Sequence, residues 1–183
     1  MLKIKKTLKE NYTAKVIPEL ETTVEIVMTE TDLSFEFFCK KSQFFSAGDT
    51  YNAPLFDGDV CEAFICTSGN IKDYYEIEVA PNGCIFLYKM HNIERGVCDE
   101  TPVPLSENFV KSEVERFGDD YRLKFSMSLD KIGYDPKVGI LFNAFRIETE
   151  GGHTDMHLMS FNPTMCETFH CPEYFVKLDE NLK

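Results

Sequence analysis

The chain has 183 residues, 43% hydrophobic and 27% charged, a composition typical of a soluble domain whose core needs no disulfide bridges. It carries 19 Lys and Arg against 31 Asp and Glu, and the net charge of −12 argues against nucleic acid and anionic membrane surfaces as partners. No apolar run has the length that a secretory signal or a membrane span requires, so we expect a cytoplasmic protein.

Short runs of alternating apolar and polar residues occupy most of the chain and are bounded by Gly, Asn, Asp or Pro. Such runs are typical of half-buried antiparallel strands, with one face on a core and the other open to solvent or ligand. They predict an all-β fold, an antiparallel β-sandwich or jelly roll of two sheets, in one domain spanning residues 1–183. The predicted strands are 23–28, 33–39, 60–65, 74–79, 84–90, 109–117, 121–127 and 138–147.

The segments outside these strands are predicted to be turns, loops and a terminal extension. The first fifteen residues carry five lysines and one glutamate, which we interpret as a frayed, solvated end within an extension at 1–20. Gly, Asp, Asn and Pro dominate 46–54, and this loop would deliver Phe56 to the strand that follows. Asn82-Gly83 is a hairpin signal, whereas 94–108 shows no period and is predicted to be loop. Seven scattered cysteines, an odd number, favour reduced thiols.

Three acidic residues mark the polar positions of two predicted strands. Glu62, Glu76 and Glu78 each lie near aromatic residues, so a carboxylate could accept hydrogen bonds from a neutral polar ligand while a ring supplies apolar contact. This is the chemistry of a sugar site, although the solvated face of an ordinary acidic sheet has the same pattern. Nothing marks one carboxylate as acid and another as nucleophile, and we predict a protein that is not an enzyme.

Several short elements, taken in order, resemble the family 9 carbohydrate-binding modules and the related DOMON-like sandwiches. Each element is weak alone, but their order along the chain matches that of the family. They cover about residues 23–179. The elements are the strand Asp59–Ile65 (DVCEAFI), the strand Tyr74–Glu78 (YYEIE) with Asn82-Gly83, the strand Asn143–Arg146 (NAFR), and the final pair Ser160–Pro163 (SFNP) and Phe169–Phe175 (FHCPEYF).

The resemblance implies a two-sheet sandwich that holds a glycan end or a small saccharide without chemistry. Phe161 stands where the family has a tryptophan in its Ser-Trp motif, and Glu62 matches the strand glutamate. The chain has no tryptophan, so phenylalanines would supply the stacking rings. We predict a carbohydrate as the partner, with no cofactor and no metal, and make no prediction of oligomeric state. The predicted carbohydrate-binding residues are Phe56, Glu62, Tyr75, Glu76, Asn143, Arg146, Phe161 and His170.

The main alternative is a metal-bearing, hydrolase-like domain near the C-terminal end. Zinc prefers about four nitrogen or sulfur ligands, and the candidates there are His153, His157, Cys166 and His170, with Cys171 beside them. Ligands four residues apart share a face only on a helix, and Gly151-Gly152 and Asn162-Pro163 argue against a helix here.

Three further interpretations compete with sugar binding. Asp57-Gly58-Asp59 is a possible calcium loop, since calcium prefers carboxylate and carbonyl oxygens. Met90-His91 offers the residue pair that binds haem in related sandwiches, but neighbours on a strand point to opposite faces and cannot share one iron. The chain could also be an interaction domain whose sheet face binds a protein partner.

Overall fold

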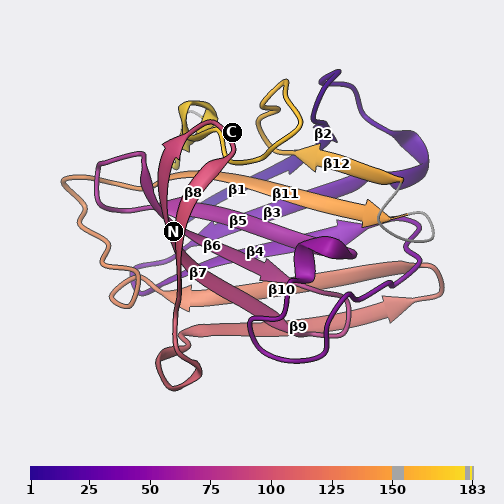
Figure 1. Ribbon diagram of the computed structural model, residues 1–183, viewed down its shortest axis with the longest axis horizontal. Helices are drawn as coiled ribbons and strands as arrows, with labels where there is room; N and C mark the ends of the chain where they lie inside the picture. Colours follow the sequence, from indigo (N-terminus) through magenta and orange to yellow (C-terminus); the bar gives the residue numbers. More distant parts are fainter. Residues whose placement is uncertain (150–154, 180–181, 183) are drawn as a thin grey trace.

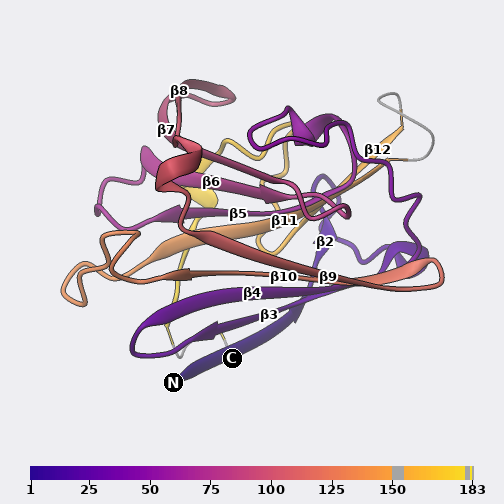
Figure 2. The same cartoon turned by 90° about the horizontal axis from the view of Figure 1, so that it is seen from below.

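The computed structural model describes residues 1–149, 155–179 and 182. Two antiparallel sheets face each other in two layers, as Figures 1 and 2 show. The smaller sheet has five strands among the described residues. In spatial order they are β1 (Leu2–Thr7), β3 (Thr22–Met28), β4 (Asp32–Cys39), β10 (Asp120–Ser128) and β9 (Val110–Phe117).

The larger sheet has eight strands among the described residues, and β13 (Val176–Lys177) pairs with β11 beside the main path. Four short 3₁₀ turns accompany the sheets, at Pro18–Leu20 (η1), Leu55–Asp57 (η2), Leu105–Glu107 (η3) and Pro172–Tyr174 (η4). None of the described helical turns is long and apolar enough to cross a membrane. In spatial order, the strands along the main path of the larger sheet are β2 (Lys9–Glu10), β12 (Met156–Ser160), β11 (Leu141–Thr149), β5 (Val60–Cys66), β6 (Asp73–Val79), β7 (Ile85–Glu94) and β8 (Val97–Pro102).

The main core lies between the two sheets. Alternation along β4 sends Leu33, Phe35 and Phe37 inward, where each is fully buried. The Phe35 ring stacks on Phe125 of β10 at 5.4 Å between centroids and meets Phe142 of β11 at 5.9 Å, so the rings join the two layers. The predicted antiparallel β-sandwich is therefore confirmed.

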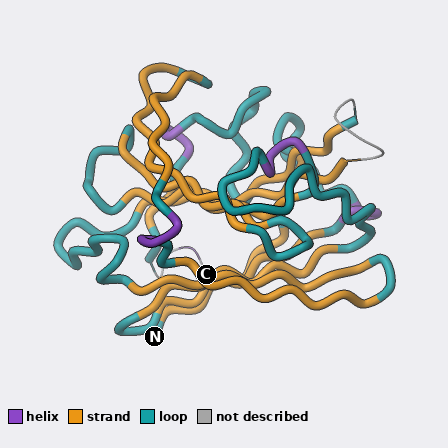
Figure 3. Tube along the Cα trace, turned by 60° about the horizontal axis from the view of Figure 1, so that its bottom comes forward, coloured by secondary structure: helices purple, strands orange, loops and turns teal. Residues whose placement is uncertain are grey.

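A second apolar cluster covers the outer face of the larger sheet, the face turned away from the smaller sheet. It contains Phe64 of β5, Phe86 of β7 and Phe145 of β11, packed under Leu55 of η2 and Phe169. Figure 3 shows loops lying over this face. The expected half-buried pattern is thus wrong for β5, which is buried along its whole length because chain segments cover both of its faces.

Two segments differ from the sequence-based expectation. The basic N-terminal run is not frayed: β1 pairs with β3 from Leu2 to Thr7, because Ile4 faces the core while Lys3 points outward to Glu25 at 2.7 Å. In the predicted loop 94–108, β8 instead forms a hairpin with β7. As a mostly exposed edge strand with few apolar residues, β8 has no alternation that sequence analysis could detect.

Candidate carbohydrate site

A cavity of about 380 Å³ opens on the outer face of the larger sheet, within the second apolar cluster. Its floor comes from β5 and β6, and its walls come from η2, β8, β12 and the segment that follows β12. The lining includes Phe56, Glu62, Phe64, Glu76, Glu78, Phe86, Glu100, Phe169 and His170.

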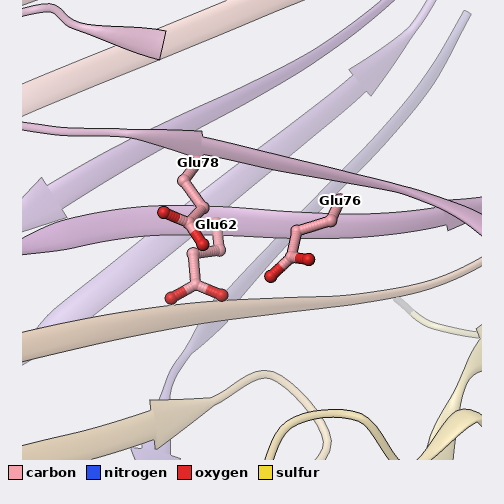
Figure 4. A group of neighbouring side chains, drawn as sticks. All are labelled: Glu62, Glu76 and Glu78. Atoms are coloured by element: carbon pink, nitrogen blue, oxygen red, sulfur yellow. The ribbon is translucent and has the colours of Figure 1, made fainter. Parts of the chain in front are cut away.

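Three glutamates converge on the floor of this cavity, and we call them the glutamate cluster (Figure 4). Glu62 of β5 pairs directly with Glu78 of β6, and Glu76 lies two residues earlier on the same face of β6. One carboxylate oxygen from each lies within 4.8 Å of the others. All three side chains are buried. Within the described chain Oε1 of Glu62 has no hydrogen-bond partner, and the Glu78 carboxyl interacts with the Glu76 carboxyl and the Phe56 backbone.

Burial and mutual repulsion dominate the electrostatics of the glutamate cluster. Burial raises the pKa of Glu62 well above its usual range, and the nearby Glu76 charge raises it further. Burial likewise raises the pKa of Glu78, with added repulsion from Glu62 and Glu76. For Glu76, burial raises the pKa to about 8. At neutral pH the cluster therefore favours protonated carboxyls, which can donate as well as accept hydrogen bonds.

His170 forms one wall of the cavity beside Glu76. Its Nδ1 lies 2.8 Å from the Tyr74 hydroxyl, its ring stacks on Phe64 at 5.0 Å, and its Nε2 lies 3.8 Å from Oε1 of Glu76. Burial lowers the pKa of His170 to about 4. The imidazole is thus neutral near pH 7 and forms no ion pair with Glu76, but its ring edge remains a polar contact for a ligand.

Phe56 supplies an accessible ring at the cavity, with 42% of its surface exposed. Its ring meets Phe86 edge to face at 5.9 Å. The loop before it is held by buried Asp59, whose Oδ2 accepts hydrogen bonds from the Ser42 hydroxyl at 3.0 Å and the Phe45 amide at 2.9 Å. A Cβ at Gly58 would lie 2.6 Å from the Phe45 carbonyl oxygen, so the close approach of these two segments requires glycine.

The structure brings four of the predicted site residues to this cavity: Phe56, Glu62, Glu76 and His170. Phe161 does not reach it. It is fully buried in the core between the sheets, where its ring lies 5.1 Å from Phe142. The family tryptophan position is thus occupied here by a core residue, which is unavailable for stacking on a ligand.

Arg146 is also withdrawn from the predicted site. Alternation along β11 places Phe145 and Ile147 in the outer cluster and Arg146 on the inner side, where it is fully buried. Its guanidinium donates to Oε2 of Glu148, to the Thr22 hydroxyl at 2.7 Å, and to the backbone carbonyls of Leu20, Lys40 and Lys41. Through these hydrogen bonds Arg146 holds the segments at Leu20 and at Lys40-Lys41 against β11, so its role is structural.

Asn143 and Tyr75 likewise have structural surroundings. Asn143 is buried and fixes the position of the segment that follows β12. Its side-chain amide donates to the Asn162 carbonyl at 2.8 Å, and its side-chain oxygen accepts from the Asn162 backbone amide at 3.0 Å. Tyr75 lies on the opposite face of β6 from Glu76, packs edge to face on Phe109 at 5.3 Å, and lines a separate cavity of about 400 Å³. The residues predicted to bind carbohydrate therefore lie on both faces of the larger sheet.

Most of the residues that line the cavity were absent from the predicted set, and three of them show why. Glu78 had a usable signal, since it sits two positions after Glu76 and so shares its face. Phe86 lies within a nearly continuous apolar run that hides its orientation. Glu100 belongs to β8, which the sequence did not reveal.

The predicted metal alternatives do not match the described residues. The only group of three or more potential ligands found among them is the glutamate cluster. Neither His157 nor Cys166 lines the cavity with His170, and His153 lies outside the described residues. Asp59 is engaged by the loop contacts above and by the Thr149 amide at 2.8 Å, which argues against a calcium loop there.

The cysteines and the Met90-His91 pair have simple surroundings. All seven cysteines are free, and the sulfur atoms of Cys166 and Cys171 lie 3.0 Å apart. Met90 is buried in the outer cluster while His91 is exposed beside Asp73, so this pair does point to opposite faces.

Comparison of the whole chain with solved structures identifies its fold. A candidate carbohydrate-binding protein from Bacteroides uniformis superposes with a TM-score of 0.73 and 18% identity, covering 93% of this chain and 83% of that one. A family 9 carbohydrate-binding module from Caldicellulosiruptor kristjanssonii in complex with glucose gives 0.62 at 12% identity, covering 94% and 83%. The fold is that of the family 9 modules.

A family 9 module from the same organism in complex with cellotriose gives a TM-score of 0.56 at 11% identity, covering 84% of this chain and 69% of that one. The likeness between this chain and the family 9 modules is one of fold, and the resemblance inferred from short motifs is confirmed at that level. No protein-family model matches the sequence, and a comparison with curated proteins finds no match either.

Proposed function

We propose that this protein binds a carbohydrate, without transforming it, in the cavity on the outer face of the larger sheet. The observation that carries the proposal is the convergence of three buried carboxyl groups with the accessible ring of Phe56 at one cavity. Carboxyl groups exchange hydrogen bonds with sugar hydroxyls, and a phenylalanine ring packs on the apolar face of a pyranose.

The size of the cavity supports a small sugar ligand. Its volume of about 380 Å³ is near the lower end of the roughly 300–1,000 Å³ usual for ligand pockets, which favours a single sugar unit or a chain end. Glucose and cellotriose are the ligands in two solved structures of the same fold, and they are the natural first probes.

The electrostatics of the carboxyl groups support binding over hydrolysis. A glycoside hydrolase needs one carboxyl group that is protonated and a second that is ionised. Burial raises the pKa of Glu62, Glu76 and Glu78 alike, so the cavity does not separate its carboxyl groups into these two roles.

Calorimetric titration with glucose and cellotriose, extended by a glycan array, tests the proposal. We expect Phe56→Ala to weaken binding about three- to tenfold, since a ring contact contributes about 0.5–1.5 kcal/mol. The matched control is Phe117→Ala, because Phe117 is 55% exposed and ends β9 of the other sheet. Absence of binding to any sugar at millimolar concentration, or equal affinity of wild type and Phe56→Ala, would contradict the proposal.

A further inference from the structure

The glutamate cluster has more acceptor oxygens than the protein satisfies. Oε1 of Glu62 is buried without a hydrogen-bond partner in the described chain, whereas the Glu78 carboxyl interacts with the Glu76 carboxyl and the Phe56 backbone. Both residues line the cavity. The side chains are 2% and 0% exposed. Buried polar groups ordinarily have partners, so an orphaned oxygen of Glu62 beside two further buried carboxyls at one cavity indicates a missing ligand.

The charge of the cavity indicates which ligand chemistry would complete it. Glu100, Glu167 and Asp57 also line the cavity, and no lysine or arginine does so among its described lining residues. Nε2 of His170, which lines the cavity, lies 3.8 Å from Oε1 of Glu76, beyond hydrogen-bond distance. The acidic lining therefore favours a cation.

We infer that Glu62, Glu76 and Glu78 bind one divalent cation of the calcium type. Calcium takes six to eight oxygen ligands at about 2.3–2.6 Å, so ligands on opposite sides of the ion are about 4.8 Å apart. One oxygen from each glutamate falls within 4.8 Å of the others, and Figure 4 shows the carboxylates turned toward a shared space.

Coordination by the glutamates leaves room for further ligands. The three carboxylates supply three to six oxygens, and the cavity of about 380 Å³ can admit waters or ligand hydroxyls to complete the sphere. Zinc is disfavoured because it prefers nitrogen and sulfur. The inference departs from the sequence-based expectation of no metal, and it stands on the carboxylates alone, so it does not require a sugar to bind.

Titration of the full chain with CaCl₂ tests the inference directly. The protein is stripped with a chelator, dialysed, and followed by calorimetry and by thermal unfolding at neutral pH without sugar. We expect one calcium per chain and a rise in melting temperature. Glu62→Gln and Glu78→Gln should each weaken calcium binding by about tenfold or more, since each removes a charged ligand. The matched control, Glu113→Gln, changes an exposed residue of β9 and should bind as wild type does.

Circular dichroism and melting in chelator establish that the glutamine variants fold. The inference is overturned if millimolar calcium produces neither heat nor a higher melting temperature, or if both variants retain wild-type affinity. It is also overturned if glucosamine, an amine, stabilises the chelated protein through Glu62 and Glu78 while calcium does not. Because no sugar takes part in the calcium titration, its result is independent of the carbohydrate proposal.

Discussion

Replacing Glu76 by glutamine tests whether the glutamate cluster is a set of buried carboxyls in the metal-free protein. A carboxyl whose pKa is higher in the folded chain than in the unfolded chain keeps its proton on folding and loses it on unfolding. Its contribution to stability is therefore complete below the unfolded pKa and is lost as the pH rises through the folded pKa. For Glu76 the window extends from about 4.3 in the unfolded chain to about 8 in the fold.

The size of the effect follows from proton linkage. Within this window the folded chain holds one more proton at Glu76 than the unfolded chain, so the free energy of unfolding falls by about 1.4 kcal/mol per pH unit. Between about pH 5 and about pH 7, Glu76 alone therefore lowers the free energy of unfolding by about 2–3 kcal/mol. Glutamine has no proton to lose, so Glu76→Gln should be more stable than wild type at pH 7 by about that amount.

Urea unfolding followed by circular dichroism at several pH values, with chelator present, measures this difference. Glu113→Gln serves as the control because Glu113 is exposed on β9 of the other sheet. We expect the pH slope of Glu76→Gln to differ from that of wild type by about 1.4 kcal/mol per pH unit, and that of the control not to differ. Identical slopes for Glu76→Gln and wild type would refute the reasoning, because Glu76 would then ionise equally in both states.

Two further predictions concern buried groups outside the cavity. Arg146→Met should lower the free energy of unfolding, measured in urea, by about 3–5 kcal/mol, since it leaves the buried Glu148 carboxylate without its ion-pair partner. Adding Glu148→Gln should recover part of this loss. A loss below about 1 kcal/mol would contradict the structural role of Arg146. In native protein, a thiol reagent followed by mass spectrometry should label Cys166 well before the buried Cys39 and Cys61. Burial raises the pKa of Cys166, but its hydrogen bonds outweigh burial and the pKa is lowered. Equal labelling rates would count against the structure.

The strands of the site were predictable because their residues alternate. On β5 and β6 the polar positions of the alternation put Glu62, Glu76 and Glu78 on one face, as observed. Alternation gave no such help on β11, where both faces are buried and polar residues fall on each face, Asn143 and Thr149 on one and Arg146 and Glu148 on the other. Arg146 could therefore be placed on the inner or the outer face with equal justification, and only the packing of Glu148 and the surrounding loops decides it.

The remaining errors come from long-range packing that a local pattern does not contain. Phe161 follows the end of β12, and its amide donates to the Ala144 carbonyl at 2.7 Å, which directs the ring into the core. The motif that placed Phe161 in the site resembles one of the family 9 modules, but the surroundings of its ring are set by Phe142 and by Lys6, whose Nζ lies 4.3 Å from the ring centroid.

The cavity draws its floor and its far wall from segments about 100 residues apart, since Glu62 lies on β5 whereas Phe169 and His170 follow β12. During synthesis from the N-terminal end, the acidic floor leaves the ribosome first and stays hydrated and ionised. Arrival of the final segment dehydrates those carboxylates, which is unfavourable unless they take up protons or a counterion at that moment. Docking of the last segment in the nascent chain is thus sensitive to the pH and ions of the surrounding solution.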